Sequence, residues 1–316
     1  MPEAVYGNLA PGGHHRSIYM KAQCMTPAIT VFDAHGNIDA EGNKRVYDHL
    51  VAGGVSGIVI MGSTGEFHAL SMAMQKELID IAVGHIRGRV RLLVGTSRPL
   101  AGETVELSEY AHDKGADGVM IVGPYYFALP DESVEAYFDA VVPATRARVY
   151  LYNYPDRTGY GISARVALNL ARKHRNIVGF KDTITDMNHT CELIRALKPE
   201  FPAFEIFSGF DNNFAHNLLS GGSGCIGALS NLAPEIFAAW ARVCDTGDWQ
   251  TVMALQKRVD TLMELYSVSS PFIPAMKKAM NLRGLAISEH CTTPILPVDG
   301  KGTAIIRDIM ERSGLL

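Results

Sequence analysis

The sequence lacks the residue spacings that metal sites and disulfide frameworks need. Its 316 residues include only five cysteines, and no two of them form a C-x-x-C pair. Eleven histidines are present, but none lies in an H-E-x-x-H arrangement. We therefore expect neither a metal site nor disulfide bonds, and a reducing cytoplasm is the simplest setting for the chain. The five cysteines are Cys24, Cys191, Cys225, Cys244 and Cys291.

A strong net charge and long apolar runs are absent as well. The formal net charge is -4, so no basic excess points to a nucleic-acid partner. No apolar run approaches the ~20 residues that a membrane span needs. The first 22 residues also lack the apolar core of a signal peptide. We predict that residues 1–22 form a polar extension in front of the folded part of the chain.

From Thr26 onward, short apolar runs alternate with longer segments of helical pattern. Eight βα units in series predict a parallel (β/α)8 TIM barrel, which we place at residues 23–246. An open doubly wound sheet is the alternative, but no G-x-G-x-x-G follows the first run. The predicted strands share β-branched and aromatic residues; they are Ala28–Phe32, Gly57–Met61, Arg91–Val94, Gly118–Val122, Val149–Tyr152, Ile177–Lys181, Glu205–Phe207 and Gly224–Ile226.

Helix signals lie between these runs. Ser71 and Ser163 are residues of the type that caps a helix N-terminus, and Gly115 marks a helix end. Residues 247–316 are predicted to form a helical C-terminal region packed on the barrel, because Trp249–Tyr266 and Pro274–Leu282 look amphipathic. The predicted barrel helices are Glu41–Ala52, Met72–Ile86, Glu103–Lys114, Ser133–Ala140, Ser163–Lys173, Met187–Leu197, Asn212–Leu219 and Pro234–Cys244.

Lys181 stands out because it ends a predicted buried strand, directly after Ile177–Phe180. Burial disfavours the ammonium form and lowers the pKa of a lysine. A neutral amine can attack a ketone or an aldehyde and form a Schiff base. The plainer interpretation is a lysine that extends to solvent at the barrel rim or pairs with a carboxylate. Lys181 is therefore a candidate nucleophile whose role depends on its neighbours.

Polar side chains follow the other strands, at the end of the barrel where active sites form. Ser63 and Thr64 are flanked by glycines and can offer hydroxyl and backbone N–H groups to the carboxylate of a 2-keto acid, or they only cap the turn. Tyr152 ends the strand next to that of Lys181. Its phenol could carry protons at an imine, unless it is a core tyrosine with a satisfied hydroxyl. Together these residues favour Schiff-base chemistry on a keto acid.

Three segments resemble the dihydrodipicolinate synthase/N-acetylneuraminate lyase family of pyruvate-dependent class I aldolases. Gly62–Glu66 resembles the family's G-[ST]-T-G-E loop, Tyr152–Pro155 its Y-N-x-P segment and Gly179–Lys181 its G-x-K segment. The resemblance covers the chain from about Thr26 to Asn231 and continues more weakly through the C-terminal helices. Because the three motifs occur together and in the family's order, the resemblance is specific.

The resemblance implies catalytic roles for four residues. Lys181 would form the imine with pyruvate, and Tyr152 would move protons at the imine and at the bond that forms or breaks. Thr64 would link Tyr152 to a second tyrosine. Tyr126 matches that tyrosine, which in the synthases comes from a neighbouring subunit. The family also implies a homotetramer built as a dimer of dimers, and no cofactor beyond the covalent imine with pyruvate.

The residues implied in substrate binding do not agree on one aldehyde. Arg157 resembles the arginine with which synthases bind the carboxylate of aspartate semialdehyde, and a guanidinium suits that role. Ser63 and Phe127 depart from the synthases. We expect a dihydrodipicolinate synthase-like enzyme of lysine biosynthesis; a 2-keto-3-deoxy sugar-acid aldolase or an N-acetylneuraminate lyase is the close alternative. The further implied substrate-binding residues are Gly65, Ile226, and Gly209 and Asp211 of a segment that resembles the sugar-acid aldolases.

Two functions of other classes remain. A keto-acid-binding regulator without turnover would not need Lys181, Tyr152, Tyr126 and Thr64 together. A phosphate-binding barrel isomerase would need a glycine-rich anion loop after the last two strands, which the sequence fits only weakly.

Overall fold

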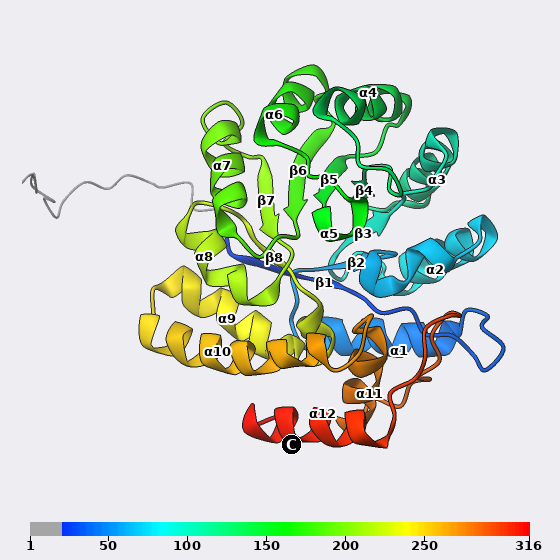
Figure 1. Cartoon of the computed structure of the whole chain (residues 1–316), viewed down its shortest axis with the longest axis vertical. Coiled ribbons are helices and arrows are strands. Elements are labelled where there is room, and N and C mark those ends of the chain that lie inside the picture. Colours follow the sequence, from blue (N-terminus) through cyan, green and yellow to red (C-terminus); the bar gives the residue numbers. More distant parts are fainter. Residues whose placement is uncertain (1–20) are drawn as a thin grey trace, which may run out of the picture.

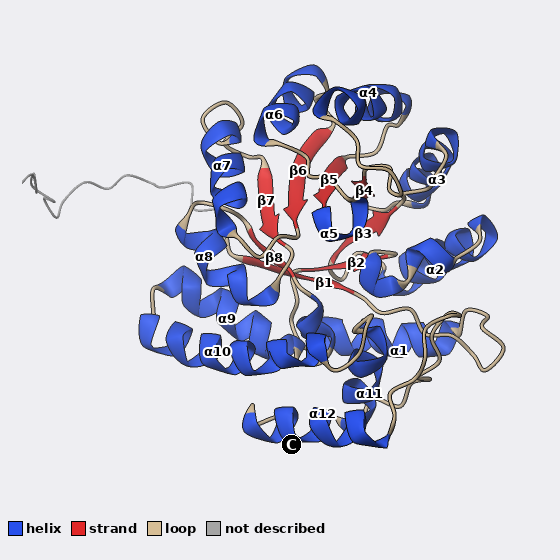
Figure 2. Ribbon diagram, in the orientation of Figure 1, coloured by secondary structure: helices blue, strands red, loops and turns tan. Residues whose placement is uncertain are grey.

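The structure is a computed structural model that describes residues 21–316; residues 1–20 of the predicted extension lie outside this range. Eight parallel strands close into a barrel in sequence order, as predicted, with β8 paired to β1 (Figure 2). The strands are β1 Gln23–Pro27, β2 Gly57–Ile60, β3 Arg91–Gly95, β4 Gly118–Val122, β5 Val149–Asn153, β6 Ile177–Asp182, β7 Glu205–Ser208 and β8 Gly224–Ile226.

Helices alternate with the strands and surround the barrel (Figure 1). Ser71 caps the second helix and Ser163 the sixth, each through its side chain, as the sequence predicts. The helices of residues 40–246 are α1 Ala40–Ala52, α2 Met72–Ile86, α3 Ala101–Lys114, α4 Asp131–Val141, α5 Pro155–Thr158, α6 Ala164–Lys173, α7 Met187–Leu197, α8 Phe214–Leu219 and α9 Pro234–Thr246. The one-turn helix α5 lies in the loop after β5 and has no counterpart among the predicted helices.

The first strand lies five residues earlier than predicted. β1 is Gln23–Pro27, and the predicted run Ala28–Phe32 continues from it as buried chain outside the named strands. Part of this run bonds to side chains instead of a neighbouring strand: the Ile29 N–H donates to Asn231 Oδ1 at 3.1 Å. An apolar run whose backbone donors are satisfied by side chains looks like a strand in the sequence, which explains the error.

The amino-terminal end of the barrel is filled by a polar cluster. Arg91, which begins β3, pairs with Glu205, which begins β7, at 2.9 Å. Tyr150 and Gln23 also donate to the Glu205 carboxylate, at 2.5 and 2.7 Å. This cluster closes the end of the barrel opposite to the carboxyl ends of the strands. The carboxyl ends are therefore the place to look for a site.

The C-terminal region forms three helices: α10 Trp249–Leu262, α11 Ile273–Leu282 and α12 Gly300–Arg312. The last of these was not singled out by the sequence. α10 packs beside α9, and α11 packs against α12, on the side of the barrel near α1 (Figure 1). A 3-10 helix, Met263–Ser267, connects α10 to the segment before α11. Among residues 21–316, no helix has the length and apolar character needed to cross a membrane.

Candidate active site

Lys181 and Tyr152 lie side by side at the carboxyl end of the barrel. β5 and β6 pair in parallel with Tyr152 and Lys181 in register. Both side chains are buried, with Lys181 4% and Tyr152 3% exposed. The Lys181 Nζ lies 4.4 Å from the centre of the Tyr152 ring. The expectation that these two residues meet therefore agrees with the geometry.

The Lys181 amine is held near the point of losing its proton. Burial lowers the pKa of Lys181 from 10.5 to about 8, although the nearby Cys225 and Asp211 act to raise it. At pH 7 about a tenth of such lysines is neutral, compared with fewer than about one in a thousand at the ordinary pKa. A buried amine of this kind can attack a carbonyl carbon.

The turn after β2 brings a hydroxyl to Tyr152. Ser63–Gly65 forms a 3-10 turn, and the Ser63 Oγ lies 3.2 Å from the Tyr152 OH. The residue in contact is Ser63, whereas the resemblance had assigned this link to Thr64. Thr64 is buried in the same turn, and its direction in a single helical turn could not be derived from the sequence. Burial raises the pKa of Tyr152, while the Ser63 and Thr183 hydroxyls act to lower it.

The turn that holds Ser63 is tightly constrained. Met61 before it and Glu66 after it both have positive φ, 54° and 55°, which is uncommon outside glycine. The Thr30 hydroxyl donates to the Gly65 carbonyl at 2.7 Å. A Cβ on Gly65 would lie 3.1 Å from the Ala28 carbonyl oxygen, so the space around this residue is tight. Residues far apart in the chain thus fix the shape of this turn.

Asp211 is buried at the rim, with both of its oxygens in use. The Tyr266 hydroxyl donates to Asp211 Oδ2 at 2.7 Å, and the Leu229 N–H donates to Oδ1 at 3.2 Å. Burial raises the pKa of Asp211 to about 6, against the effect of these donors. The prediction that Asp211 binds substrate hydroxyls therefore gains no support from the geometry. Tyr266 belongs to the C-terminal region, which the sequence did not connect with the site.

Two other predicted positions lie in the same part of the barrel. Gly209 follows β7, and its N–H donates to the Asp182 carbonyl at 2.7 Å. A Cβ on Gly209 would lie 2.0 Å from the Thr183 hydroxyl oxygen, so this glycine permits close packing of β6 and β7. Ile226 is the last residue of β8 and is fully buried. Both positions shape the barrel end around Lys181.

Arg157 lies on α5 with an exposed guanidinium. The centre of that group is 5.5 Å from the ring centre of Tyr154, whose ring lies 6.0 Å from that of Tyr152. Within the described residues Arg157 forms no ion pair with the adjacent Asp156. The guanidinium is therefore placed near the mouth of the site with its fork available to an anion.

Tyr126 is not brought to Tyr152 within one chain. It lies in the loop between β4 and α4 with 88% of its surface exposed, and its ring centre lies 4.9 Å from that of the exposed Phe127. Its φ is 99°, a strained value for a tyrosine. Such exposure of two adjacent aromatic residues is typical of an association surface.

Behind Lys181 lies a network that the sequence analysis missed. The buried Asp182 carboxylate accepts hydrogen bonds from Asn153, His189 and Thr190, at 2.8, 2.9 and 2.6 Å. Asp182 follows Lys181 directly and faces the opposite side of the strand. Its partners come from β5 and α7, so this network fixes the end of β6. The only signal in the sequence was a second charged residue at the end of a buried strand.

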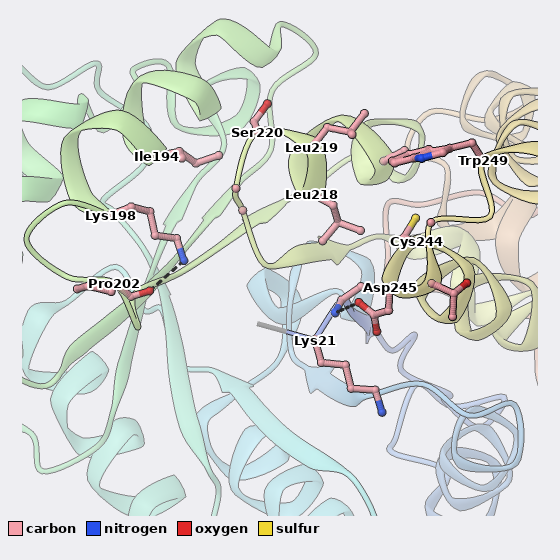
Figure 3. A pocket seen from close by; sticks show the side chains of 16 residues that line it. Lys21, Ile194, Lys198, Pro202, Leu218, Leu219, Ser220, Cys244, Asp245 and Trp249 are labelled. Carbon is pink, nitrogen blue, oxygen red and sulfur yellow. Dashed lines mark hydrogen bonds between the residues drawn. The ribbon is translucent and has the colours of Figure 1, made fainter. Parts of the chain in front are cut away.

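One cavity lies away from all of these residues. It has a volume of about 1000 Å³ and is lined by residues such as Lys21, Lys198, Gly221 and Trp249 (Figure 3). These residues precede strands β1, β7 and β8 or lie in α10, so the cavity is at the amino-terminal side of the barrel. No residue predicted to be catalytic lines it. Among residues 21–316, no group of His, Cys, Asp or Glu side chains is arranged to hold a metal ion.

Comparison with known proteins identifies the family that the three sequence motifs resemble. A family model described as "Dihydrodipicolinate synthetase family" matches residues 20–312. The chain is 32% identical to the Escherichia coli K12 protein named "Probable 2-dehydro-3-deoxy-D-pentonate aldolase YjhH", over 92% of this chain and 96% of that one. It is 31% identical to a 4-hydroxy-tetrahydrodipicolinate synthase of Gluconacetobacter diazotrophicus, over 92% and 97%.

The solved structures that resemble the chain belong to the same group. The crystal structure of YagE, a prophage protein of E. coli K12 in complex with pyruvate, superimposes with a TM-score of 0.91 at 31% identity. It covers 93% of this chain and 99% of YagE. The family model matches nearly the whole chain, and the relatives and solved structures agree with it. The chain therefore belongs to the dihydrodipicolinate synthetase family of lyases and aldolases.

Proposed function

We propose that the protein is a class I aldolase in which Lys181 forms a Schiff base with pyruvate. The observation that carries the proposal is the buried Lys181 amine, with its lowered pKa, against the Tyr152 ring. The amine attacks the keto carbon of pyruvate and forms a carbinolamine, which loses water to give an iminium ion. Ser63 and Thr64 bind the pyruvate carboxylate through the turn after β2, and Tyr152 donates the proton that the leaving hydroxyl needs.

The carbon–carbon bond step follows from the same arrangement. Loss of a proton from the methyl group converts the iminium ion into an enamine, whose terminal carbon attacks an aldehyde. In the cleavage direction the same bond breaks, the aldehyde leaves and the enamine takes up a proton. We assign the transfer of this proton to Tyr152, and its hydrogen bond with Ser63 and its position beside Lys181 support this assignment.

For the aldehyde partner we favour a short hydroxyaldehyde, which makes the protein a 2-keto-3-deoxy sugar-acid aldolase. Two relatives at 32% identity carry the names of 2-dehydro-3-deoxy pentonate and gluconate aldolases, and the YagE structure gives a TM-score of 0.91. Ser63 and Phe127 also depart from the synthase pattern. These observations outweigh the initial preference for a synthase.

A second candidate is the condensation of pyruvate with aspartate semialdehyde, as in the synthases. The exposed Arg157 fork beside Tyr154 supports it, because a planar guanidinium binds a carboxylate through two hydrogen bonds. A relative named as a synthase is 31% identical to the chain. The two candidates share the imine at Lys181 and differ only in whether the aldehyde carries a carboxylate.

The shared step is tested by trapping. Incubation with pyruvate and borohydride should add one reduced pyruvoyl group to the intact protein, and peptide mapping should locate it on Lys181. Lys181→Ala should abolish the adduct, whereas Lys198→Ala, another lysine with a lowered pKa but outside the site, should leave it unchanged. An adduct that persists in Lys181→Ala would assign the nucleophile to another residue.

The aldehyde partner is tested by a substrate panel. Pyruvate release should be measured from 2-keto-3-deoxy pentonate and gluconate, and condensation should be measured with aspartate semialdehyde. A sugar-acid aldolase should show the higher kcat/KM for the keto-deoxy acids, and Arg157→Ala should change it little. If aspartate semialdehyde is preferred and Arg157→Ala raises its KM by about tenfold or more, the synthase assignment is correct.

A further inference from the structure

A buried ion pair connects the C-terminal region to the turn that carries Ser63. Lys277 of α11 lies 2.8 Å from Glu66 Oε1, and neither side chain has any exposed surface. The Lys277 ammonium also donates to the His290 carbonyl at 2.7 Å. The second oxygen of Glu66 accepts from the Thr292 N–H at 2.7 Å and from the Thr292 hydroxyl at 2.8 Å. The two charges are therefore fully paired inside the protein.

This pair is poorly explained by stability alone. A buried ion pair loses the hydration of both ions, and apolar residues of similar volume often serve stability as well. Charged hydrogen bonds also impose a direction and a distance on the groups that they join. What Glu66 fixes in space is the end of the Ser63–Gly65 turn, because it follows that turn directly.

The backbone of Glu66 is in an unfavourable conformation that its side-chain partners must hold in place. Its φ and ψ are 55° and 33°, a left-handed conformation that non-glycine residues seldom adopt. Its N–H donates to the Ser63 carbonyl at 3.2 Å and closes the turn. A relaxation of Glu66 would therefore move Ser63 and Thr64. Ser63 is the residue that contacts the Tyr152 hydroxyl.

We propose that Lys277 and Thr292 are positioning residues that act through Glu66 on the keto-acid carboxylate site. They hold the Ser63–Gly65 turn at the distance from Tyr152 and Lys181 that pyruvate binding requires. The C-terminal region, which lies after the barrel in sequence, is thus part of the binding machinery without touching the substrate. This inference rests on the proposed function, since it concerns how pyruvate is bound.

The test uses a double variant, Glu66→Gln with Lys277→Met, which removes both charges and leaves no buried ion unpaired. The amide introduced in place of the carboxylate needs no ammonium partner, and its oxygen can still accept from Thr292. We expect the double variant to unfold cooperatively on heating. We also expect it to need about tenfold more pyruvate for half-maximal borohydride trapping on Lys181. The trapped fraction at saturating pyruvate should stay near that of the unaltered protein.

The half-saturating pyruvate concentration and the trapped fraction at saturation together distinguish a positioning role from a structural role. Damage to the fold would lower the trapped fraction at saturation and leave the half-saturating pyruvate concentration unchanged. The control is Lys278→Met, the same substitution one residue further on α11, where the lysine pairs with Glu289. It should leave both quantities unchanged. If the double variant does not fold, Thr292→Val, which removes only one hydroxyl donor, should raise the half-saturating concentration about threefold.

Different results would contradict the positioning role and the proposed function. If the unaltered protein forms no adduct with pyruvate, the proposed function is wrong and this inference falls with it. If the unaltered protein is trapped and the folded variants show the same half-saturating pyruvate concentration, the positioning role is wrong and the aldolase proposal stands.

Discussion

At the scale of single residues, one ionised neighbour opposes the effect of burial on the pKa of Lys181. Burial lowers its pKa to about 8, and both Cys225 and Asp211 act in the opposite direction. The pKa of Cys225 is itself raised well above its ordinary value by burial, so this thiol is neutral at pH 8. Asp211, with a pKa of about 6, is ionised at that pH. Its carboxylate is therefore the charge that favours the ammonium form of Lys181.

This environment predicts the pH dependence of imine formation. The rate of borohydride-trapped adduct formation at low pyruvate should rise with pH up to about 8 and then level off, because the neutral amine is the nucleophile. Asp211→Asn should move this inflection to lower pH, since the stabilising charge is removed. The measurement is the initial trapping rate between pH 6 and pH 10, with Asp156→Asn on α5 as the control. An inflection near 10.5, the ordinary lysine value, would contradict the prediction.

Contacts between the candidate site residues were predictable from the sequence only where strand order determines them. Lys181 and Tyr152 end consecutive strands, and consecutive strands of a barrel are neighbours, so their contact follows from the sequence. The choice between Ser63 and Thr64 depends on side-chain directions within one helical turn. The burial of Asp211 depends on Tyr266, 55 residues further along the chain. Neither of these last two features has a periodic signal in the sequence.

At the scale of secondary-structure elements, the Asp182–His189 contact joins β6 to α7. The His189 Nδ1 lies 2.9 Å from Asp182 Oδ2, and Nε2 lies 3.1 Å from the Ile162 carbonyl. A carboxylate and a carbonyl only accept hydrogen bonds, so both ring nitrogens must carry protons. Burial acts to lower the pKa of His189, but Asp182 and the Ile162 carbonyl raise it above 6.5 overall. The ring is therefore a charged link between the strand of Lys181 and its covering helix.

The raised pKa makes this link depend on pH. Its contribution to the free energy of unfolding is complete below the unfolded pKa of about 6.5, and it is lost as pH rises through the higher folded pKa. His189→Gln should therefore destabilise the protein by about 1–3 kcal/mol at pH 6 and by less at pH 9. Urea unfolding midpoints at a series of pH values measure this difference.

The control for this prediction is His85→Gln, since His85 pairs with Asp48 at the surface, where ion pairs contribute little. A destabilisation by His189→Gln that stays constant from pH 6 to pH 9 would show that His189 is neutral in the folded protein. In that case one of its two contacts would be a poor hydrogen bond, and the ionic link would be absent.

Elements themselves were predicted well where capping and length provided independent signals. The serine caps of α2 and α6 and the eight apolar runs were sufficient for the barrel. β1 was misplaced because Ala28–Phe32 is as buried and apolar as a strand but bonds partly to asparagine side chains. The short α5 was missed because four residues carry no helical period. Such features depend on tertiary partners that local sequence does not contain.

At the scale of the whole molecule, one chain does not complete the predicted catalytic set. Lys181 and Tyr152 lie side by side within the chain, but Tyr126 lies on an exposed loop with Phe127, at 88% and 72% exposure. The strained backbone of Tyr126 is also unexplained by contacts within the described chain. If a second copy covers this loop, each site combines Lys181 and Tyr152 of one chain with Tyr126 of its partner. The protein would then be active only as an oligomer with shared sites.

Shared sites predict recovery of activity when two inactive variants are mixed. Lys181→Ala lacks the nucleophile and Tyr126→Phe lacks the donated hydroxyl. In a mixed pair, the chain with Lys181 intact receives Tyr126 from its Lys181→Ala partner, so one site is complete. Random exchange of equal amounts should restore roughly a quarter of the unaltered activity. The control is a mixture of Lys181→Ala with Tyr152→Phe, which should stay inactive because both residues belong to the same chain's site. If exchange is verified by mass and neither mixture recovers, Tyr126 takes no part in a partner's site.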